Sequence, residues 1–135
     1  MNYSVSADAL KGKVILVTGA GNGIGRQAAL SYAEHGATVI LLGRNVQNLE
    51  SIYDEIEAAG YPQAAIIPLD LKGATKQNYI DMAETIEGQF GRLDGLLHNA
   101  GVLSSLCPFD QIKEEDFDDI MQINVKAEVL MTQAL

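Results

Sequence analysis

The sequence predicts an α/β fold built on a doubly wound parallel sheet. Short apolar runs alternate along the chain with segments of helical periodicity, which is typical of βαβ units. The first run, Val14 to Val17, is apolar at every position, as in a strand that helices cover on both faces. A chain of 135 residues has the length of one domain, and we treat residues 1–135 as a single domain.

The first strand is expected at residues 13–18. The first helix is expected at 24–35, because alanines and Tyr32 recur there at helical spacing. Gly36 follows as the expected helix cap, and a second apolar run predicts the second strand at 38–42.

The same alternation continues through the rest of the chain. A second helix is expected at 45–59, a third strand at 65–69, a third helix at 76–90 and a fourth strand at 93–97. The third helix is expected to turn one face to the core, formed by Ile80, Ala83, Ile86 and Phe90. A last helix is expected to begin near Glu114.

The fourth strand should lie at an open edge of the sheet. Right-handed crossovers place it beside the first strand, on the side opposite the second strand. An apolar edge strand without a neighbour invites aggregation, and folded proteins normally cover it. We therefore expect the sequence to be the N-terminal portion of a larger α/β domain.

Composition excludes several classes of protein. The net charge of −9 argues against nucleic acid as a partner, and no apolar run approaches the ~18 residues of a membrane span. The N-terminus does not resemble a signal peptide, and the single Cys107 suits a reducing compartment, so we expect a cytoplasmic protein. The acidic segment 110–119 is interpreted as a solvated loop and an acidic first helical turn, and no metal site is expected.

A glycine-rich turn joins the first strand to the first helix. It reads Thr-Gly-Ala-Gly-Asn-Gly-Ile-Gly over residues 18–25. Glycine lets a ligand approach the backbone closely, and the N–H groups at the start of the next helix attract phosphate. In this strand–turn–helix context, the turn predicts a Rossmann-type dinucleotide site.

The end of the second strand distinguishes the two nicotinamide dinucleotides. An acid about 20 residues after the glycine turn would bind the ribose 2′-hydroxyl of NAD, whereas an arginine can accept the 2′-phosphate of NADP. Gly43 and Arg44 occupy this place, and no acid does. The sequence therefore favours NADP(H) over NAD(H); the alternative is that Arg44 is only an exposed residue at a strand end.

Four motifs in order resemble the short-chain dehydrogenase/reductase family. They are the Thr-Gly-x-x-x-Gly-x-Gly turn, Asp70-Leu71, Asn99-Ala100-Gly101, and Asn124 within Ile-Asn-Val. The stretches around Arg44 and Asn99 are most similar to bacterial oxidoreductases of this family with undefined substrates. Family members usually associate through the last helix, so the resemblance also implies a homo-oligomer.

The resemblance implies roles for the matching positions. The glycine turn would hold the pyrophosphate and adenosine ribose, Arg44 the 2′-phosphate, Asp70-Leu71 the adenine, and residues 99–101 would line the cofactor cleft. The predicted cofactor-binding residues are Gly19, Gly21, Asn22, Gly23, Ile24, Gly25, Arg44, Asp70, Leu71, Asn99, Ala100 and Gly101. Two positions depart from the family pattern. NADP-preferring relatives often carry a second basic residue where this chain has Asn22. The family often has another asparagine where this chain has His98, which we interpret as a packed histidine at a strand end.

Asn124 is the predicted catalytic residue. It lies in a largely apolar helical stripe, where a side-chain amide needs hydrogen-bond partners. The resemblance implies that Asn124 holds a water in a proton relay and bends the helix locally. The alternative is a core asparagine whose amide is satisfied by the backbone.

The other catalytic groups of the family are a Tyr-x-x-x-Lys pair and a serine. No tyrosine in the sequence has a lysine four residues later, so the 135 residues alone should not catalyse the reaction. The sequence predicts part of an NADP(H)-dependent oxidoreductase that interconverts a small-molecule carbonyl and an alcohol by hydride transfer. The alternatives are a non-catalytic NADP-binding module or sensor, and another Rossmann-type enzyme such as a methyltransferase.

Overall fold

The structure, a computed structural model, describes residues 3–135. The elements up to the last strand are β1 (Val14–Thr18), α1 (Gly23–Glu34), β2 (Thr38–Gly43), α2 (Val46–Ala58), β3 (Ala65–Pro68), α3 (Lys76–Phe90) and β4 (Gly95–Leu97). A short 3-10 turn, η1 (Phe109–Gln111), precedes a continuous helical segment made of α4 (Glu114–Met121), the π-helical η2 (Gln122–Lys126) and α5 (Ala127–Ala134). All strands and helices expected from the sequence are present, with boundaries that differ by one or two residues.

The four strands form a parallel sheet in the order β3-β2-β1-β4. Val17 of β1 lies between Leu41 of β2 and Leu97 of β4. The predicted place of β4 beside β1 is therefore confirmed. Within residues 3–135, no strand pairs with the other edge of β4.

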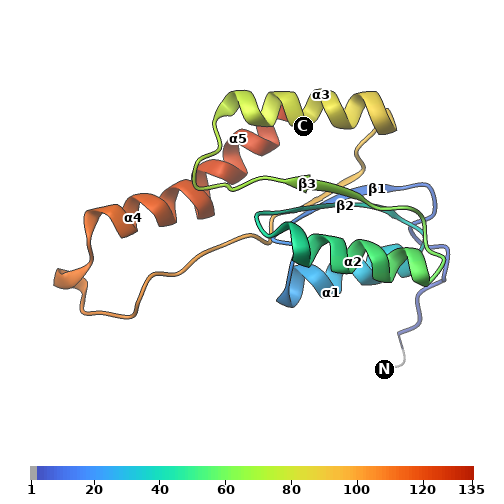
Figure 1. The fold of residues 1–135 in the computed structure, drawn as a ribbon, viewed down its shortest axis with the longest axis horizontal. Helices are drawn as coiled ribbons and strands as arrows, with labels where there is room; N and C mark the ends of the chain where they lie inside the picture. Colours follow the sequence, from blue (N-terminus) through green and yellow to red (C-terminus); the bar gives the residue numbers. More distant parts are fainter. Residues whose placement is uncertain (1–2) are drawn as a thin grey trace.

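Helices cover both faces of the sheet, as Figure 1 shows. α1 and α2 pack on one face, where Val17 and Leu41 are fully buried. α3, η2 and α5 cover the other face, where Leu16 and Ile40 are fully buried. Because neighbouring side chains of a strand point to opposite faces, two covered faces explain why the strands are apolar at every position.

The buried face of α3 differs from the one expected. Tyr79, Met82 and Ile86 are buried, whereas Ile80 and Ala83 are only partly buried. An aromatic ring and a flexible thioether offer more apolar area to the sheet than the side chain of Ala83. Ile86 is buried as expected and Phe90 packs against the same core, so the buried face overlaps the predicted one and is shifted toward Tyr79 and Met82.

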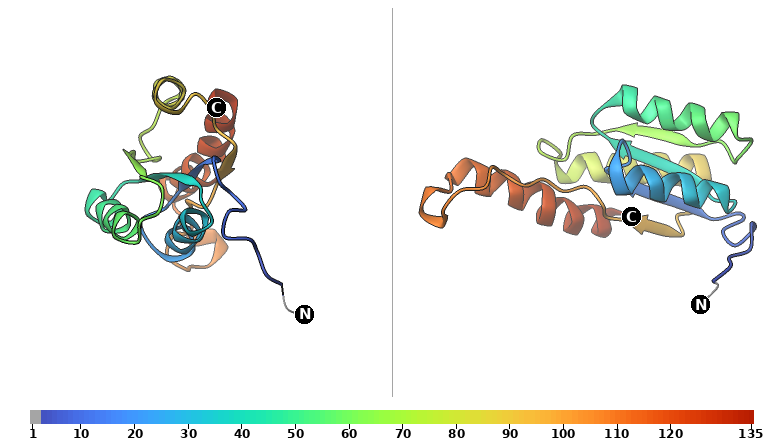
Figure 2. Two further views of the ribbon diagram at one scale, coloured as in Figure 1. Left: turned by 90° about the vertical axis from the view of Figure 1, so that its right-hand side faces the viewer. Right: turned by 90° about the horizontal axis from the view of Figure 1, so that it is seen from below.

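The segment before η2 extends away from the sheet, and Figures 1 and 2 show α4 beyond the carboxyl ends of the strands. No residue of α4 is buried, and Glu114, Glu115 and Asp116 occupy its first turn. Carboxylates at this end of a helix interact favourably with the helix dipole, which accounts for part of the acidic segment. Residues 3–135 contain no helix with the length and apolar character to cross a membrane, and no cluster of metal-ligating side chains.

The start of β4 is fixed to β1 through Asp94. Its carboxylate accepts hydrogen bonds from the Arg92 guanidinium at 2.6 and 2.8 Å and from the Val14 N–H at 2.8 Å. These hydrogen bonds hold the pKa of Asp94 below its ordinary value. The bond from Arg92 contributes most, and the bond from the Val14 N–H contributes next. This anchor sets the register of β4 at the end of the sheet opposite the site.

Candidate functional site

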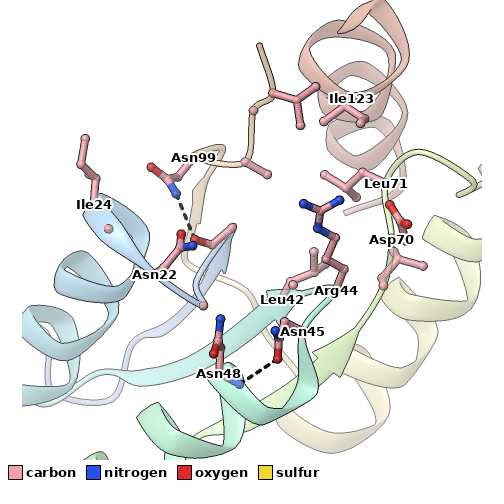
Figure 3. A pocket seen from close by; sticks show the side chains of 18 residues that line it. Asn22, Ile24, Leu42, Arg44, Asn45, Asn48, Asp70, Leu71, Asn99 and Ile123 are labelled. Atoms are coloured by element: carbon pink, nitrogen blue, oxygen red, sulfur yellow. Dashed lines mark hydrogen bonds between the residues drawn. The ribbon is translucent and has the colours of Figure 1, made fainter. Parts of the chain in front are cut away.

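A pocket of about 360 Å³ opens at the carboxyl ends of the four strands. The turn after β1, the segments that follow β2, β3 and β4, and Ile123 of η2 all contribute to its lining, as Figure 3 shows. On one side of β1 lies β2, the next strand along the chain, and on the other side lies β4, so the strand order reverses at β1. Ligands of open α/β sheets bind at such a switch point.

Of the predicted cofactor-binding residues, all but Gly25 line this pocket. Gly25 lies behind the turn, where an added Cβ would be 2.3 Å from the Gly19 carbonyl oxygen and 2.4 Å from Asn99 Nδ2. Gly25 therefore lets α1 begin directly against the turn, and it does not form the wall of the pocket. Gly19 has a φ of +61°, and its added Cβ would lie 2.9 Å from Ala100 Cα, so this position also requires glycine.

Thr18 and Asn99 join the ends of β1 and β4. The Thr18 hydroxyl accepts hydrogen bonds from the N–H groups of Asn99 and Ala100, both at 3.0 Å. The Asn99 amide donates to the Thr18 and Gly19 carbonyl oxygens, both at 3.2 Å. The glycine turn and the 99–101 segment are therefore one hydrogen-bonded wall of the pocket.

The start of α1 is open to the pocket. Asn22 is the N-cap residue of α1, yet its side chain makes no capping hydrogen bond, and the first turn contains no acid. The first N–H groups of a helix have no intrahelical partner, and together with the helix dipole they favour a negatively charged ligand. This arrangement can hold the pyrophosphate of a dinucleotide.

Among residues 3–135, Arg44 is the only cation that lines the pocket, and Asp70 is the only carboxylate. Within residues 3–135, the Arg44 side chain forms no ion pair. Asp70 instead accepts a hydrogen bond from the Lys72 N–H at 3.0 Å. Figure 3 shows the guanidinium extending into the pocket, where it can bind a phosphate.

Several lining residues were not predicted from the sequence. They are Leu42, Gly43, Asn45, Asn48, Leu69, Val102 and Ile123. Asn45 accepts a hydrogen bond from the Asn48 N–H at 3.1 Å, the ordinary arrangement of a helix N-cap. An asparagine at a helix start therefore carries no sequence signal for a ligand. The apolar lining residues lie at the ends of β2 and β3, after β4 and in η2, and they belong to the core, so they carry no such signal either.

Asn124 does not line the pocket, although its neighbour Ile123 does. Its Nδ2 donates to the Val102 carbonyl oxygen and its Oδ1 accepts from the Val102 N–H, both at 2.8 Å. The expected local distortion of the helix is present as the π-helical η2. The structure thus pairs the amide with backbone, and a catalytic role for Asn124 stays a prediction.

His98 lies at the end of β4 as a partly buried residue. Its Nε2 is 2.8 Å from the Thr132 hydroxyl of α5. This contact agrees with its interpretation as a packed histidine at a strand end.

Residues 13–135 match the family model described as short chain dehydrogenase. The uncharacterized oxidoreductase YciK of Escherichia coli (strain K12) is 44% identical over 135 residues, which cover 100% of this chain and 54% of that protein. The chain thus spans about half the length of this relative.

Two of the solved structures that are similar to this chain illustrate the match. A candidate short chain dehydrogenase from Pseudomonas syringae shares 50% sequence identity at a TM-score of 0.96, covering 100% of this chain and 56% of that one. A candidate short chain dehydrogenase from Escherichia coli CFT073, complexed with NADPH, shares 44% identity at a TM-score of 0.93, covering 97% and 55%. Because the family match over residues 13–135 includes every motif that builds the pocket, this chain belongs to the short-chain dehydrogenase family of oxidoreductases.

Proposed function

We propose that this chain binds NADP(H) in the pocket at the carboxyl ends of its strands. The choice of NADP(H) over NAD(H) rests on one observation. The Arg44 guanidinium lines the pocket and has no ion-pair partner in residues 3–135. A carboxylate at this place would repel a 2′-phosphate, whereas a guanidinium can hydrogen-bond it with matched geometry. The similarity to a structure complexed with NADPH supports the same choice.

Each wall of the pocket has a part in this proposal. Bound NADP(H) would supply or accept the hydride that interconverts a carbonyl and an alcohol. The turn 19–24 and the start of α1 would bind the pyrophosphate, and Asp70 and Leu71 would flank the adenine. The segment 99–101, held by Thr18, would line the rest of the cleft.

Arg44→Asp tests the choice of cofactor by titration calorimetry with NADPH and NADH. We expect NADPH affinity to fall about 10- to 100-fold, the equivalent of a lost charged hydrogen bond, while NADH affinity changes little. Lys76→Asp is the matched control, because it reverses a charge at the start of α3, outside the pocket. Equal losses for the two cofactors in Arg44→Asp would contradict a 2′-phosphate site.

The second candidate is a non-catalytic NADP-binding module or sensor. It is favoured by one observation, the absence of any tyrosine with a lysine four residues later in these 135 residues. An assay of NADPH oxidation in the presence of small aldehydes and ketones separates the two candidates. A binding module would not oxidise NADPH with any of these carbonyl compounds.

We also propose that the protein is a homo-oligomer of the cytoplasm. Phe117, Met121, Val125 and Val129 recur every four residues along α4, η2 and α5, and their side chains are exposed. A stripe of this kind on one helix face fits association with another helix. The single Cys107, which is free and exposed, fits a reducing compartment.

A further inference from the structure

The corner of the pocket between the glycine turn and α2 is lined by carboxamides. Asn22 comes from the start of α1, and Asn45 and Asn48 come from the start of α2 (Figure 3). Arg44 is the only cation of the pocket, so a second base is absent from its described lining. A doubly charged phosphate in this corner would need hydrogen-bond donors besides the one guanidinium.

Asn48 has a free side chain in this corner. Its backbone N–H is bonded to Asn45 Oδ1 at 3.1 Å, which uses the Asn45 side-chain oxygen as a helix cap. The Asn48 amide itself makes no hydrogen bond within residues 3–135, and the residue is exposed. A side-chain amide in this state has two N–H donors available to a ligand.

The glycine turn lies directly against Asn48. A Cβ added to Gly21 would be 3.3 Å from Asn48 Cβ and 3.8 Å from its Nδ2. The absence of a side chain at Gly21 therefore brings the turn into contact with the first turn of α2. This contact places the Asn48 amide in the same pocket as the Arg44 guanidinium.

We infer that Asn48 is a specificity-determining residue that donates a hydrogen bond to the 2′-phosphate beside Arg44. This inference rests on the proposed binding of NADP(H). Because the amide is neutral, its contribution to affinity is smaller than that of Arg44. NADH, which has no phosphate on this ribose, would gain nothing from Asn48.

Asn48→Asp tests the inference, with NADPH and NADH titrated against each variant of the complete protein. The aspartate has the same shape, and at the third position of α2 it interacts favourably with the helix dipole, so the fold is retained. We expect NADPH affinity to fall about tenfold or more through repulsion, and NADH affinity to stay within about twofold.

Asn78→Asp is the matched control, because it makes the same change at the third position of α3, outside the pocket. Its capping acceptor for the Thr75 N–H is kept by the aspartate. Asn48→Ala removes the donor without adding charge, and a loss of about 2- to 10-fold for NADPH alone is expected from one neutral hydrogen bond.

Two results would overturn the role of Asn48. One is a loss in Asn48→Asp no greater than in Asn78→Asp, and the other is unchanged NADPH affinity in Asn48→Ala. If Arg44→Asp still loses NADPH selectively, only the role of Asn48 fails. If wild type shows no preference for NADPH and Arg44→Asp changes nothing, the proposed cofactor itself is wrong.

Discussion

The two buried hydroxyl groups of Thr18 and Tyr79 differ in their hydrogen bonding. The Thr18 hydroxyl is buried, and it joins β1 to the 99–101 segment through two accepted N–H bonds at 3.0 Å. The Tyr79 hydroxyl is fully buried in α3 and has no hydrogen-bond partner within residues 3–135. Burial without a partner also raises the pKa of Tyr79 above its ordinary value.

Tyr79→Phe should leave the protein as stable or more stable. A buried hydroxyl without a partner costs about 1–3 kcal/mol of desolvation, and phenylalanine keeps the ring that fills the core. We expect the free energy of unfolding in urea to rise by about 1 kcal/mol. Tyr53→Phe, which removes a hydroxyl bonded to Gln63 at the surface, serves as the control. A clear loss of stability in Tyr79→Phe would show that the hydroxyl is bonded to a buried water.

Among the elements, η2 connects the helical segment to the pocket. Its Ile123 lines the pocket, and its Asn124 holds both backbone groups of Val102, another lining residue. π-Helical turns inserted in α-helices are frequent at functional sites, since the extra residue redirects side chains and backbone. Asn124 thus acts on the wall of the pocket even without contact to a ligand.

Asn124→Asp should open this wall. A carboxylate keeps an acceptor for the Val102 N–H but leaves the Val102 carbonyl oxygen, now bonded at 2.8 Å, without its donor. We expect faster hydrogen exchange at the amides of residues 101–103 and a weaker affinity for NADPH. Gln133→Glu, at an exposed position of α5 whose side chain makes no hydrogen bond within residues 3–135, controls for the added charge. Unchanged exchange at Val102 would contradict a role for this pair in holding the wall.

The sequence predicted those parts of the molecule that have a local signal. Apolar runs predicted the strands, and a parallel sheet necessarily gathers Gly19, Arg44, Asp70 and Asn99 at one edge. The π-helical form of η2 has no signal in side-chain periodicity, and the pairing of its Asn124 with Val102 joins segments distant in sequence. The packing role of Gly25 and the contact of Asn48 with Gly21 likewise depend on segments distant in sequence.

At the scale of the whole molecule, the chain leaves apolar surface uncovered. Only one edge of β4 is paired within residues 3–135. Leu103, Leu106 and Phe109, in the segment after β4, are 80%, 92% and 91% exposed. Monomeric proteins rarely expose large apolar patches or bare apolar strands, so we propose that further protein covers both.

The intact mass of the protein from its native source tests what provides that cover. We expect a mass nearly twice the 14.5 kDa of these 135 residues, because they span 54% of the oxidoreductase YciK and 56% of the Pseudomonas syringae chain. The additional chain would then pair with β4 and should carry a Tyr-x-x-x-Lys sequence, the general acid/base that these residues lack. A mass near 14.5 kDa would contradict this prediction. The β4 edge would then have to be covered by a separate chain, and a binding module or sensor would describe the protein better than an oxidoreductase.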